Sequence, residues 1–279
     1  MGANIKQIKS RIKSVDSTLH ITKAMQLVAS SKVRRAQVAA AGGTAYAEAM
    51  RESFLTMVSG DTASSVFVTP PKIGIPCYIL IAGDRGLAGG YNGNLFRLLE
   101  TEAADPHAVF LPIGKRARDY CHRRGLTTVC DEELSSEKLT DGQLSTLSDL
   151  LCDGFRSHRF DAVKLIHTKM HSVLSQEAIC TPLLPLPVAQ NTAATVTLYE
   201  PDPETLMNRA VSDYLTAAIG AAVRESFLCE LYARRNAMDS ASQNAVEMIA
   251  SLSLQYNRAR QSSITQEITE IVAGAEGQQ

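Results

Sequence analysis

The stretch "NIKQIKSRIKSVDSTLHITKAMQLVASSKVRRAQVAA", residues 4–40, decides the fold of this chain. Apolar and small residues recur along it at alternating spacings of three and four, the pattern of a helix that packs lengthwise against a second helix. The seam is formed by Ile5, Ile8, Ile12, Val15, Leu19, Thr22, Gln26, Ala29, Val33, Ala36 and Ala40. Its side chains shrink from isoleucine and leucine to alanine, so we expect the partner helix to approach more closely along the second half.

The partner helix is predicted at the other end of the chain. Glycine and proline, which most often interrupt helices, are absent between Gly2 and Gly42, and residues 204–273 contain only Gly220. A second seam runs through Met238, Ala241, Ala245, Met248, Leu252, Gln255, Ala259 and Ser262. Both helices far exceed the mean globular length of about 11–12 residues. The middle of the chain cannot enclose both, so we expect a long antiparallel two-helix coiled coil.

The middle of the chain alternates between short apolar runs and helical stretches. Strands are predicted at residues 76–83, 108–114, 126–130 and 161–170. Helices are predicted at 92–104, in a basic stretch that ends at Arg123, and at 143–156. Residues 182–188 are extended and broken by proline, which places them at a sheet edge. This alternation predicts a mainly parallel, three-layer, Rossmann-like α/β domain at 74–190, between coiled-coil helices at 1–60 and 204–279.

The end of the last helix differs from the rest of it. Its coiled-coil seam becomes polar, while a new apolar stripe begins with Ile264, Ile268 and Ile271. The acids Glu267 and Glu270 lie near the C-terminus, where the helix dipole disfavours negative charge. We therefore expect this tip to contact something other than its own coil.

Charge is distributed unevenly in a chain of 279 residues whose formal net charge is only -1. The first forty residues carry one acid, Asp16, against Lys6, Lys9, Arg11, Lys13, Lys23, Lys32, Arg34 and Arg35. This asymmetry indicates either a basic surface that meets an acidic partner or two segments of opposite sign that lie together. We expect no nucleic acid as partner, since tryptophan is absent and aromatic residues make up 5% of the chain, too few to stack bases.

The glycine-rich stretch "GDRGLAGGYNGN", residues 83–94, follows a predicted strand and precedes a predicted helix. Phosphate-binding loops occupy that place in α/β domains. The spacing matches neither G-x-G-x-x-G nor a P-loop, which requires Lys followed by Ser or Thr after the glycines. We favour a turn that lets the backbone pass close to its sheet or to a partner.

Other candidate sites are weaker. His167 and His171 have a spacing of four, but they lie on a predicted strand, where they would be far apart. The six cysteines form no CxxC pair and are interpreted as buried, reduced thiols. Acid clusters such as Asp131, Glu132 and Glu133 are interpreted as solvated surface. We therefore expect no catalytic site, no bound metal and no cofactor.

Four motifs together resemble one known family. They are "IKSRIKSVDSTLHITKAMQLVASSKVRRA", "GDRGLAGGYN", "LYEPDP" and "YNRARQSSITQEITEIVAGA", which occur in this order. The set closely resembles the gamma subunit of the rotary ATP synthase, the central stalk, and the C-terminal string is highly specific to that family. The resemblance implies a fold of two long antiparallel helices and an α/β domain, in agreement with the patterns above.

The resemblance also implies a function without catalysis. The family's coiled coil stands inside a hexamer of alpha and beta subunits, and its base sits with the epsilon subunit on a membrane-embedded c-ring driven by protons or sodium ions. Rotation imposes different conformations on three otherwise identical catalytic sites. This chain would then be peripheral to the membrane through its complex. Because Met1 opens directly into the heptads, we expect a bacterial protein at the cytoplasmic face of the plasma membrane.

The resemblance assigns partner contacts to particular residues of this chain. The contact to the catch loops of the catalytic subunits would fall on Arg260, Gln261 and Thr265, with Glu267 and Glu270 beside them. Met25 would face the beta-subunit lever, with Arg234 across the coil from it. The glycine loop near those levers and the foot facing the ring and epsilon would comprise Gly86, Gly89, Gly90, Asn92, Tyr199, Glu200 and Asp202.

Two departures from the family pattern affect the expected structure. Ala88 stands where the family usually has cysteine in the glycine loop, which we interpret as a packing change. Gly42 and Gly43 fall where most relatives continue the helix, so we expect a bend or a frayed turn there. Two alternatives stay open from the sequence: a structural coiled-coil scaffold with an α/β appendage and, less favoured, a nucleotide-binding enzyme.

Overall fold

The computed structural model describes residues 2–58, 66–68, 74–103, 105–130, 132–186 and 203–276. The chain divides into two compact units. The coil unit consists of residues 1–30 and 234–279, and the sheet unit consists of residues 31–233. The predicted domain boundaries lie at the ends of the long helices. The boundaries between the two compact units instead lie within both long helices.

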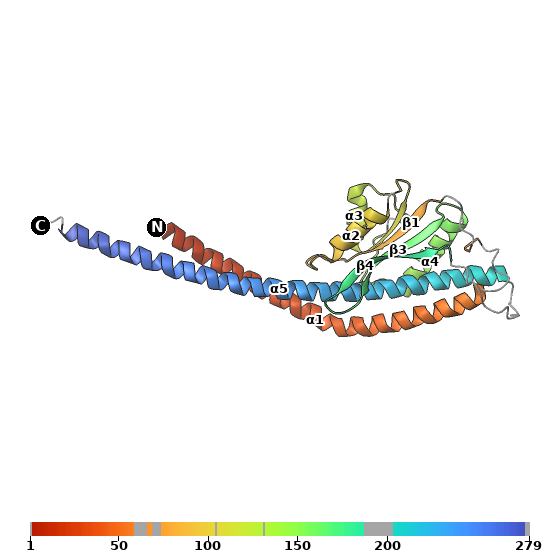
Figure 1. The fold of residues 1–279 in the computed structure, drawn as a ribbon, viewed down its shortest axis with the longest axis horizontal. Coiled ribbons are helices and arrows are strands. Elements are labelled where there is room, and N and C mark those ends of the chain that lie inside the picture. Colours follow the sequence, from red (N-terminus) through yellow and green to blue (C-terminus); the bar gives the residue numbers. More distant parts are fainter. Residues whose placement is uncertain are drawn as a thin grey trace. The chain divides into compact units, whose positions relative to one another are not determined.

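Two long helices begin and end the described chain (Figure 1). Helix α1 spans Gly2–Val58 and helix α5 spans Pro203–Glu276, with 57 and 74 residues. In the coil unit the two helices run antiparallel, and a buried hydrogen bond of 2.7 Å joins Thr22 Oγ1 to Ser242 Oγ. Gln26 Nε2 donates to Asp239 Oδ1 at 2.8 Å nearby. The predicted antiparallel pairing is confirmed.

The seam of α1 is buried as the sequence predicts. Every predicted seam residue from Ile5 to Ala40 is buried or half-buried, while most residues between them are exposed. The seam of α5 is only partly as predicted, because Met248, Gln255 and Ser262 are exposed. The neighbouring residues take their places at spacings of four and three: Ser242, Ala245, Ile249, Leu252, Tyr256, Ala259 and Ser263. At Met248 and Ile249, and at Ser262 and Ser263, both alternatives are apolar or small, so spacing alone could not select the buried one.

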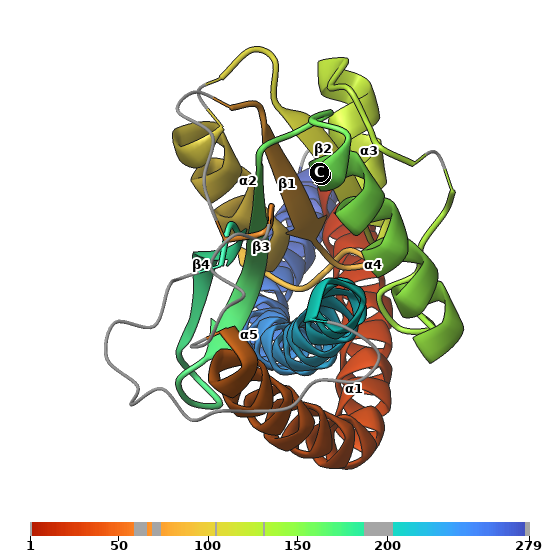
Figure 2. The ribbon, with the colours of Figure 1, turned by 90° about the vertical axis from the view of Figure 1, so that its right-hand side faces the viewer.

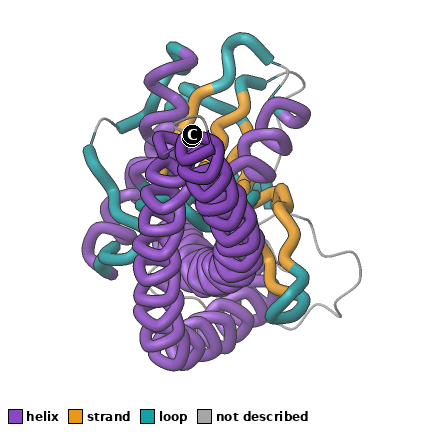
Figure 3. The backbone as a smooth tube through the Cα atoms, turned by 90° about the vertical axis from the view of Figure 1, so that its left-hand side faces the viewer, coloured by secondary structure: helices purple, strands orange, loops and turns teal. Residues whose placement is uncertain are grey.

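The described residues of the sheet unit form one sheet of four strands (Figure 3), in the order β2-β1-β3-β4. The strands are β1 (Pro76–Ile81), β2 (Val109–Ile113), β3 (Ala162–Met170) and β4 (Gln176–Leu184). Strand β1 is parallel to β2 and β3, with Ile79 beside Leu111 and Leu165. Strand β4 is antiparallel to β3 and forms one edge of the sheet, opposite β2. The mainly parallel sheet is confirmed.

Two predicted segments of the sheet differ from the structure. Residues 126–130 form no strand, because Thr128 alone bridges to Phe110. This segment follows directly on Gly125, whose φ of 63° ends the preceding helix. Strand β4 begins at Gln176, six residues before the predicted extended segment at Pro182. The tight turn at residues 171–175 contains no glycine, proline or asparagine to signal the hairpin.

Helices cover both faces of the sheet, which confirms the three layers. Helices α2 (Tyr91–Glu102) and α3 (Lys115–Arg124) lie on one side in Figure 1, and α4 (Asp141–Arg156) and α5 lie on the other. On β1, Tyr78 and Leu80 face α2 and α3, whereas Cys77, Ile79 and Ile81 face the second layer. The second core is completed by the first part of α5, through Met207, Val211, Leu215, Ile219 and Val223. The α/β domain therefore includes parts of both long helices.

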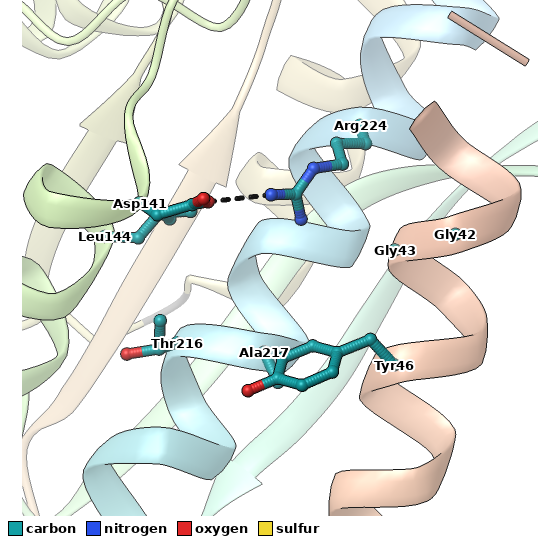
Figure 4. Close-up of a pocket in the computed structure, with 8 residues that line it drawn as sticks. All are labelled: Gly42, Gly43, Tyr46, Asp141, Leu144, Thr216, Ala217 and Arg224. Carbon is teal, nitrogen blue, oxygen red and sulfur yellow. Dashed lines mark hydrogen bonds and ion pairs between the residues drawn. The ribbon is translucent and has the colours of Figure 1, made fainter. Parts of the chain in front are cut away.

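Helix α1 continues through Gly42 and Gly43 without a break, so the expected frayed turn is absent. Figure 2 shows that the second half of α1 curves around α5. A Cβ atom on Gly43 would lie 3.5 Å from Ala221 Cα and 3.1 Å from Arg224 Cδ, so the missing side chain permits a close approach of the two helices. Figure 4 shows the hollow of about 450 Å³ beside these glycines, spanned by the ion pair of Arg224 and Asp141 at 2.8 Å.

The two helical glycines should respond differently to alanine. A Cβ atom on Gly42 would have no neighbour within 4 Å, so Gly42→Ala should raise the free energy of unfolding by about 1 kcal/mol through helix propensity. Gly43→Ala should gain less, because its methyl group displaces the Arg224 side chain. Urea unfolding of the full chain measures both. Equal gains would show that Gly43 has no packing role.

Gly114, which precedes α3, should not tolerate any side chain. Its φ is 97°, and a Cβ atom would lie 1.9 Å from the carbonyl oxygen of Ala82. Gly114→Ala should therefore lower the free energy of unfolding by on the order of 3 kcal/mol or more. Gly142→Ala, in α4 with no neighbour within 4 Å, is the matched control and should not destabilise. A stable Gly114→Ala variant with native circular dichroism would contradict this backbone geometry.

Candidate functional site

The C-terminal part of α5 extends past the beginning of α1 (Figure 1). The hydrogen bond of Thr22 with Ser242 fixes the register of the antiparallel pair. Counting equal steps from it along both helices brings Ile5 opposite about Ala259. From about Ser263 onward, α5 has no residue of α1 beside it among the described residues. This section of α5 is called the tip below, residues 263–273.

The tip presents an apolar stripe to solvent. The exposed fractions of Ile264, Ile268 and Ile271 are 43%, 56% and 72%, and Val272 is exposed by 52%. Burying such side chains gains roughly 1.5–3 kcal/mol each, a gain that this chain does not obtain by itself. An exposed apolar stripe of this kind marks an interaction surface.

The polar residues assigned to the catch-loop contact are exposed on the same part of α5. Arg260, Gln261, Thr265, Glu267 and Glu270 all lie at the surface. Two hydrogen bonds of these residues remain within the helix: Thr265 Oγ1 donates to Gln261 O at 3.0 Å, and Glu270 Oε1 accepts from Gln266 Nε2 at 2.8 Å. Apart from these local contacts, the side chains point outward and are available to a partner.

Met25 and Arg234 lie on facing helices but not at the same level. Met25 is half-buried, and Arg234 is buried with 8% of its surface exposed. The register places Met25 opposite about Asp239, and Arg234 precedes that level by five residues in α5. At a rise of about 1.5 Å per residue this offset exceeds one helical turn along the axis, and the assignment of Met25 and Arg234 to one partner contact stays a prediction.

The glycine loop between β1 and α2 is closed by a side chain at its end. Gly83 N donates to Asn92 Oδ1 at 3.0 Å, so the side chain of Asn92 closes the loop. A Cβ atom on Gly83 would lie 2.7 Å from the carboxyl carbon of Glu230 in α5, which supports the interpretation as a close-passing turn. Gly89, with φ of 57°, and Gly90 are exposed, and Gly86 is half-buried.

Leu87 is a surface residue that the sequence patterns did not single out. It lies at the turn of the glycine loop with φ of 61°, and 62% of its surface is exposed. A left-handed conformation is unusual for a residue with a branched side chain, and the structure gains no burial from it. The sequence offered one signal for Leu87, namely a large apolar residue between Gly86 and the small Ala88 in an otherwise polar loop.

Asp84 holds the base of the glycine loop. Its carboxylate accepts four hydrogen bonds, from Ser135 Oγ (2.7 Å) and from the backbone N–H groups of Lys115 (3.0 Å), Glu137 (3.1 Å) and Ser136 (3.3 Å). Burial by itself raises the pKa of Asp84, but these hydrogen bonds outweigh burial, that from Ser135 foremost, and hold the pKa below its usual value.

Glu137 connects this loop to α1 within the sheet unit. Lys32 Nζ, on α1, forms an ion pair with Glu137 Oε1. Arg85 of the glycine loop lies 3.9 Å from the other carboxylate oxygen of Glu137. These two ion pairs link the glycine loop to α1 through the 132–138 segment. The spacing of residues in the sequence gave no reason to expect this link.

The remaining candidates form no reactive centre. Among the described residues, no group of three or more His, Cys, Asp or Glu side chains could hold a metal ion. His171 pairs with Glu177 at 2.8 Å at the surface, while His167 is buried. All six cysteines are free, and four of them are buried. Tyr199, Glu200 and Asp202 lie outside the described residues.

Comparisons with known proteins all point to one family. The family model described as ATP synthase matches residues 4–277. The sodium-ion-specific ATP synthase gamma chain of Acetobacterium woodii is 37% identical, with 99% of each chain covered. The ATP synthase gamma chain of Ruminococcus albus is 39% identical, with 96% of each covered.

Solved structures show the same fold. A chain of the Euglena gracilis mitochondrial ATP synthase, solved with its F1 part and c-ring, superposes with a TM-score of 0.71 at 18% identity, covering 99% of this chain and 95% of that one. A chain of the central stalk and c-ring of the Tetrahymena thermophila enzyme gives a TM-score of 0.62 at 20% identity, covering 80% of this chain and 99% of that one.

The contribution of Asp84 to stability should depend on pH. Because folding lowers its pKa, its stabilisation is fully present above the unfolded pKa of about 3.9 and is lost as the pH falls through the folded pKa. Asp84→Asn should therefore lower the free energy of unfolding by about 1–2 kcal/mol at pH 7. The difference from the wild type should shrink below about pH 4.

Urea unfolding at a series of pH values measures this difference. Glu133→Gln is the matched control, since Glu133 lies in the adjoining segment but makes a solvent-exposed ion pair with Arg118, which contributes little. A loss for Asp84→Asn that stays constant down to pH 3 would show that the charge of Asp84 is irrelevant.

Proposed function

This chain belongs to the ATP synthase gamma-chain family, and from that premise we propose that it is the rotor shaft of its complex. The gamma chain is a component of ATP synthase and forms the central stalk. In the proposed function it couples ion-driven rotation of the membrane ring to conformational changes at the catalytic beta-subunit sites. The chain itself performs no catalysis, and catalysis belongs to its partners.

The tip of α5 carries this proposal. A lone helix with exposed Ile264, Ile268 and Ile271 gains nothing within its own chain, so its apolar stripe requires a partner. We propose the alpha and beta subunits of the catalytic hexamer as that partner. Arg260, Gln261, Thr265, Glu267 and Glu270 lie on the same helix and would contact the catch loops.

An asymmetric shaft explains how one chain could act on three equivalent sites. The tip is a single helix, whereas α1 and α5 lie side by side in the rest of the coil unit. A ring of identical subunits around such a shaft meets a different surface in each direction. Each subunit would then favour the conformation that its contact stabilises, which is a population shift imposed by rotation.

Other proposed contacts lie along the chain. Met25 would face the beta-subunit lever, with Arg234 across the coil from it. The glycine loop, with Leu87 as its most exposed apolar side chain, would lie near the same levers. Residues 199–202 would form the foot on the c-ring and the epsilon subunit.

The proposed location follows from these partners. None of the helices in the described part of the chain is long and apolar enough to span a bilayer. We place the chain at the cytoplasmic face of the bacterial plasma membrane, held there by the c-ring.

ATPase turnover tests the proposal. Purified alpha and beta subunits of the same organism should assemble with the full chain and hydrolyse ATP faster than they do alone. A chain cut after Asn257 lacks the tip and should lose most of this stimulation or of the assembly. A chain cut after Ala273 retains the stripe and is the matched control, with turnover close to that of the full chain.

The outcomes separate the shaft from a scaffold. If the full chain neither joins the alpha and beta subunits nor raises their turnover, the rotor function is wrong and a structural coiled-coil scaffold takes its place. If both shortened chains behave like the full chain, the shaft function stands but the tip is not the element through which it acts.

A further inference from the structure

The last part of β3 extends past its neighbour β1. The parallel pairing of the two strands ends at Leu80 and Ile166, whereas β3 continues to Met170. On its other side β3 is paired with β4 up to Met170. Among the described residues, no strand lies beside residues 168–170 of β3 on the side of β1. The backbone groups that point to that side therefore need other partners.

Side chains of α5 supply these partners. Thr168 N donates to Ser226 Oγ at 3.2 Å, and Met170 N donates to Glu225 Oε1 at 3.0 Å. Cys229 Sγ donates to Thr168 O at 3.8 Å. Thr168 thus directs both its N–H and its carbonyl group toward α5, as it would toward a neighbouring strand. Glu225, Ser226 and Cys229 are called the β3 anchor below.

The β3 anchor is buried, and a second helix is bonded to it. Ser226 and Cys229 are fully buried, and Tyr91 of α2 donates its hydroxyl to Ser226 O at 3.0 Å. Burial above all, and also the nearby charge of Glu230, raise the pKa of Tyr91, so its hydroxyl stays protonated and donates near pH 7. Hydrogen bonds in a low-dielectric interior are stronger than those in water. One turn of α5 is therefore bonded to β3 and to α2 together.

The preceding section of α5 offers little resistance to rotation about the helix axis. Residues 217–222 consist of four alanines, Ile219 and Gly220, and hydrophobic contact of such small residues is not directional. Further back, Ser212 and Thr216 are hydrogen-bonded to the adjacent helix α4. The bonds of the β3 anchor, by contrast, are made to the backbone of a strand within the sheet.

The position of the β3 anchor along α5 is also informative. The sheet unit includes α5 up to Ala233, and the helix continues in the coil unit from Arg234. The β3 anchor therefore lies in the last turns of α5 that belong to the sheet unit. Its three side chains fall within roughly a third of the helix circumference. Because hydrogen bonds are directional, bonds made from one side fix the rotation of α5 about its own axis.

We propose that Ser226 and Glu225 are positioning residues that fix the rotational angle of α5 on the sheet and thereby transmit torque between the sheet unit and the shaft. This inference rests on the proposed rotor function, in which α5 must not turn against the sheet when the sheet unit is driven. Neither residue belongs to the contacts proposed with other subunits, and both act through the helix that carries those contacts.

Amide hydrogen exchange of the free chain tests the anchor itself. Ser226→Ala removes the acceptor of Thr168 N, and exchange of that amide should become about tenfold faster, the effect of one lost hydrogen bond. Glu225→Met should have the same effect on Met170, whereas Glu225→Gln keeps an acceptor oxygen and should exchange like the wild type. Ser53→Ala, which removes an exposed hydroxyl on α1 in the same unit, is the matched control without effect.

Ion transport by the assembled complex in lipid vesicles tests the torque. A complex that contains the double variant Glu225→Met, Ser226→Ala should still hydrolyse ATP. The number of ions transported per ATP should fall as the opposing ion gradient is raised, because α5 then turns against the sheet under load. Complexes with Glu225→Gln or Ser53→Ala should keep the wild-type ratio at every gradient.

Circular dichroism verifies that each variant is folded. Should the double variant not fold, Glu225→Met gives the same test alone, because Glu225 is only half-buried and Glu225→Gln controls for the change of charge.

The outcomes separate this inference from the function on which it rests. Unchanged exchange of Thr168 and Met170 in the variants would overturn the anchor, whatever the chain does in its complex. Faster exchange together with a wild-type transport ratio against the gradient would overturn the torque role alone. A wild-type complex that transports no ions during hydrolysis would reject the rotor function and this inference with it.

Discussion

The antiparallel pairing of α1 with α5 is the constraint on which the rest of the structure depends. Helices of 57 and 74 residues carry apolar stripes too long for one small sheet to cover. Each helix can bury its stripe only against the other, and the Thr22–Ser242 hydrogen bond fixes their register within a buried seam. The register in turn determines how far α5 extends beyond α1, and hence where the tip begins.

The same helices serve a second purpose in the sheet unit. Helices α2 and α3 cover one face of the sheet, but α4 alone cannot cover the other, and the first part of α5 completes that core through residues such as Leu215 and Ile219. Small residues make this possible. Gly43 permits the close approach of α1 to α5 at Ala221, and Ala36 and Ala40 pack against Leu228 and Tyr232. The same pair of helices therefore forms a coiled coil in one part of its length and a layer of the α/β domain in the other.

The hydrophobic periodicity predicted the repeating parts of the fold correctly. It failed where a single tertiary contact decides which residue is buried. The seam from Ile5 to Ala40 was predicted correctly because eleven positions support one another. The shift from Met248 to Ile249 was missed because both residues are apolar, and only the facing helix selects between them. The four hydrogen bonds to Asp84 come from residues at least thirty positions away in the chain, so no local pattern could reveal them. The tip, by contrast, was readable because Ile264, Ile268 and Ile271 conflict with the fading seam.

The most informative positions are those at which a residue gains no stabilisation from the rest of its own chain. Glu267 and Glu270 lie near the unfavourable end of the helix dipole, the three isoleucines of the tip stay exposed, and Leu87 has a left-handed conformation without burial. Elsewhere the local and tertiary preferences agree, as in the capping box of Thr140 and Gln143 at the start of α4. When agreement is general, isolated exceptions mark sites at which something outside the chain supplies the missing stabilisation. All three exceptions lie on the surfaces proposed to contact the catalytic hexamer, so the local conflicts and the proposed shaft function have one explanation.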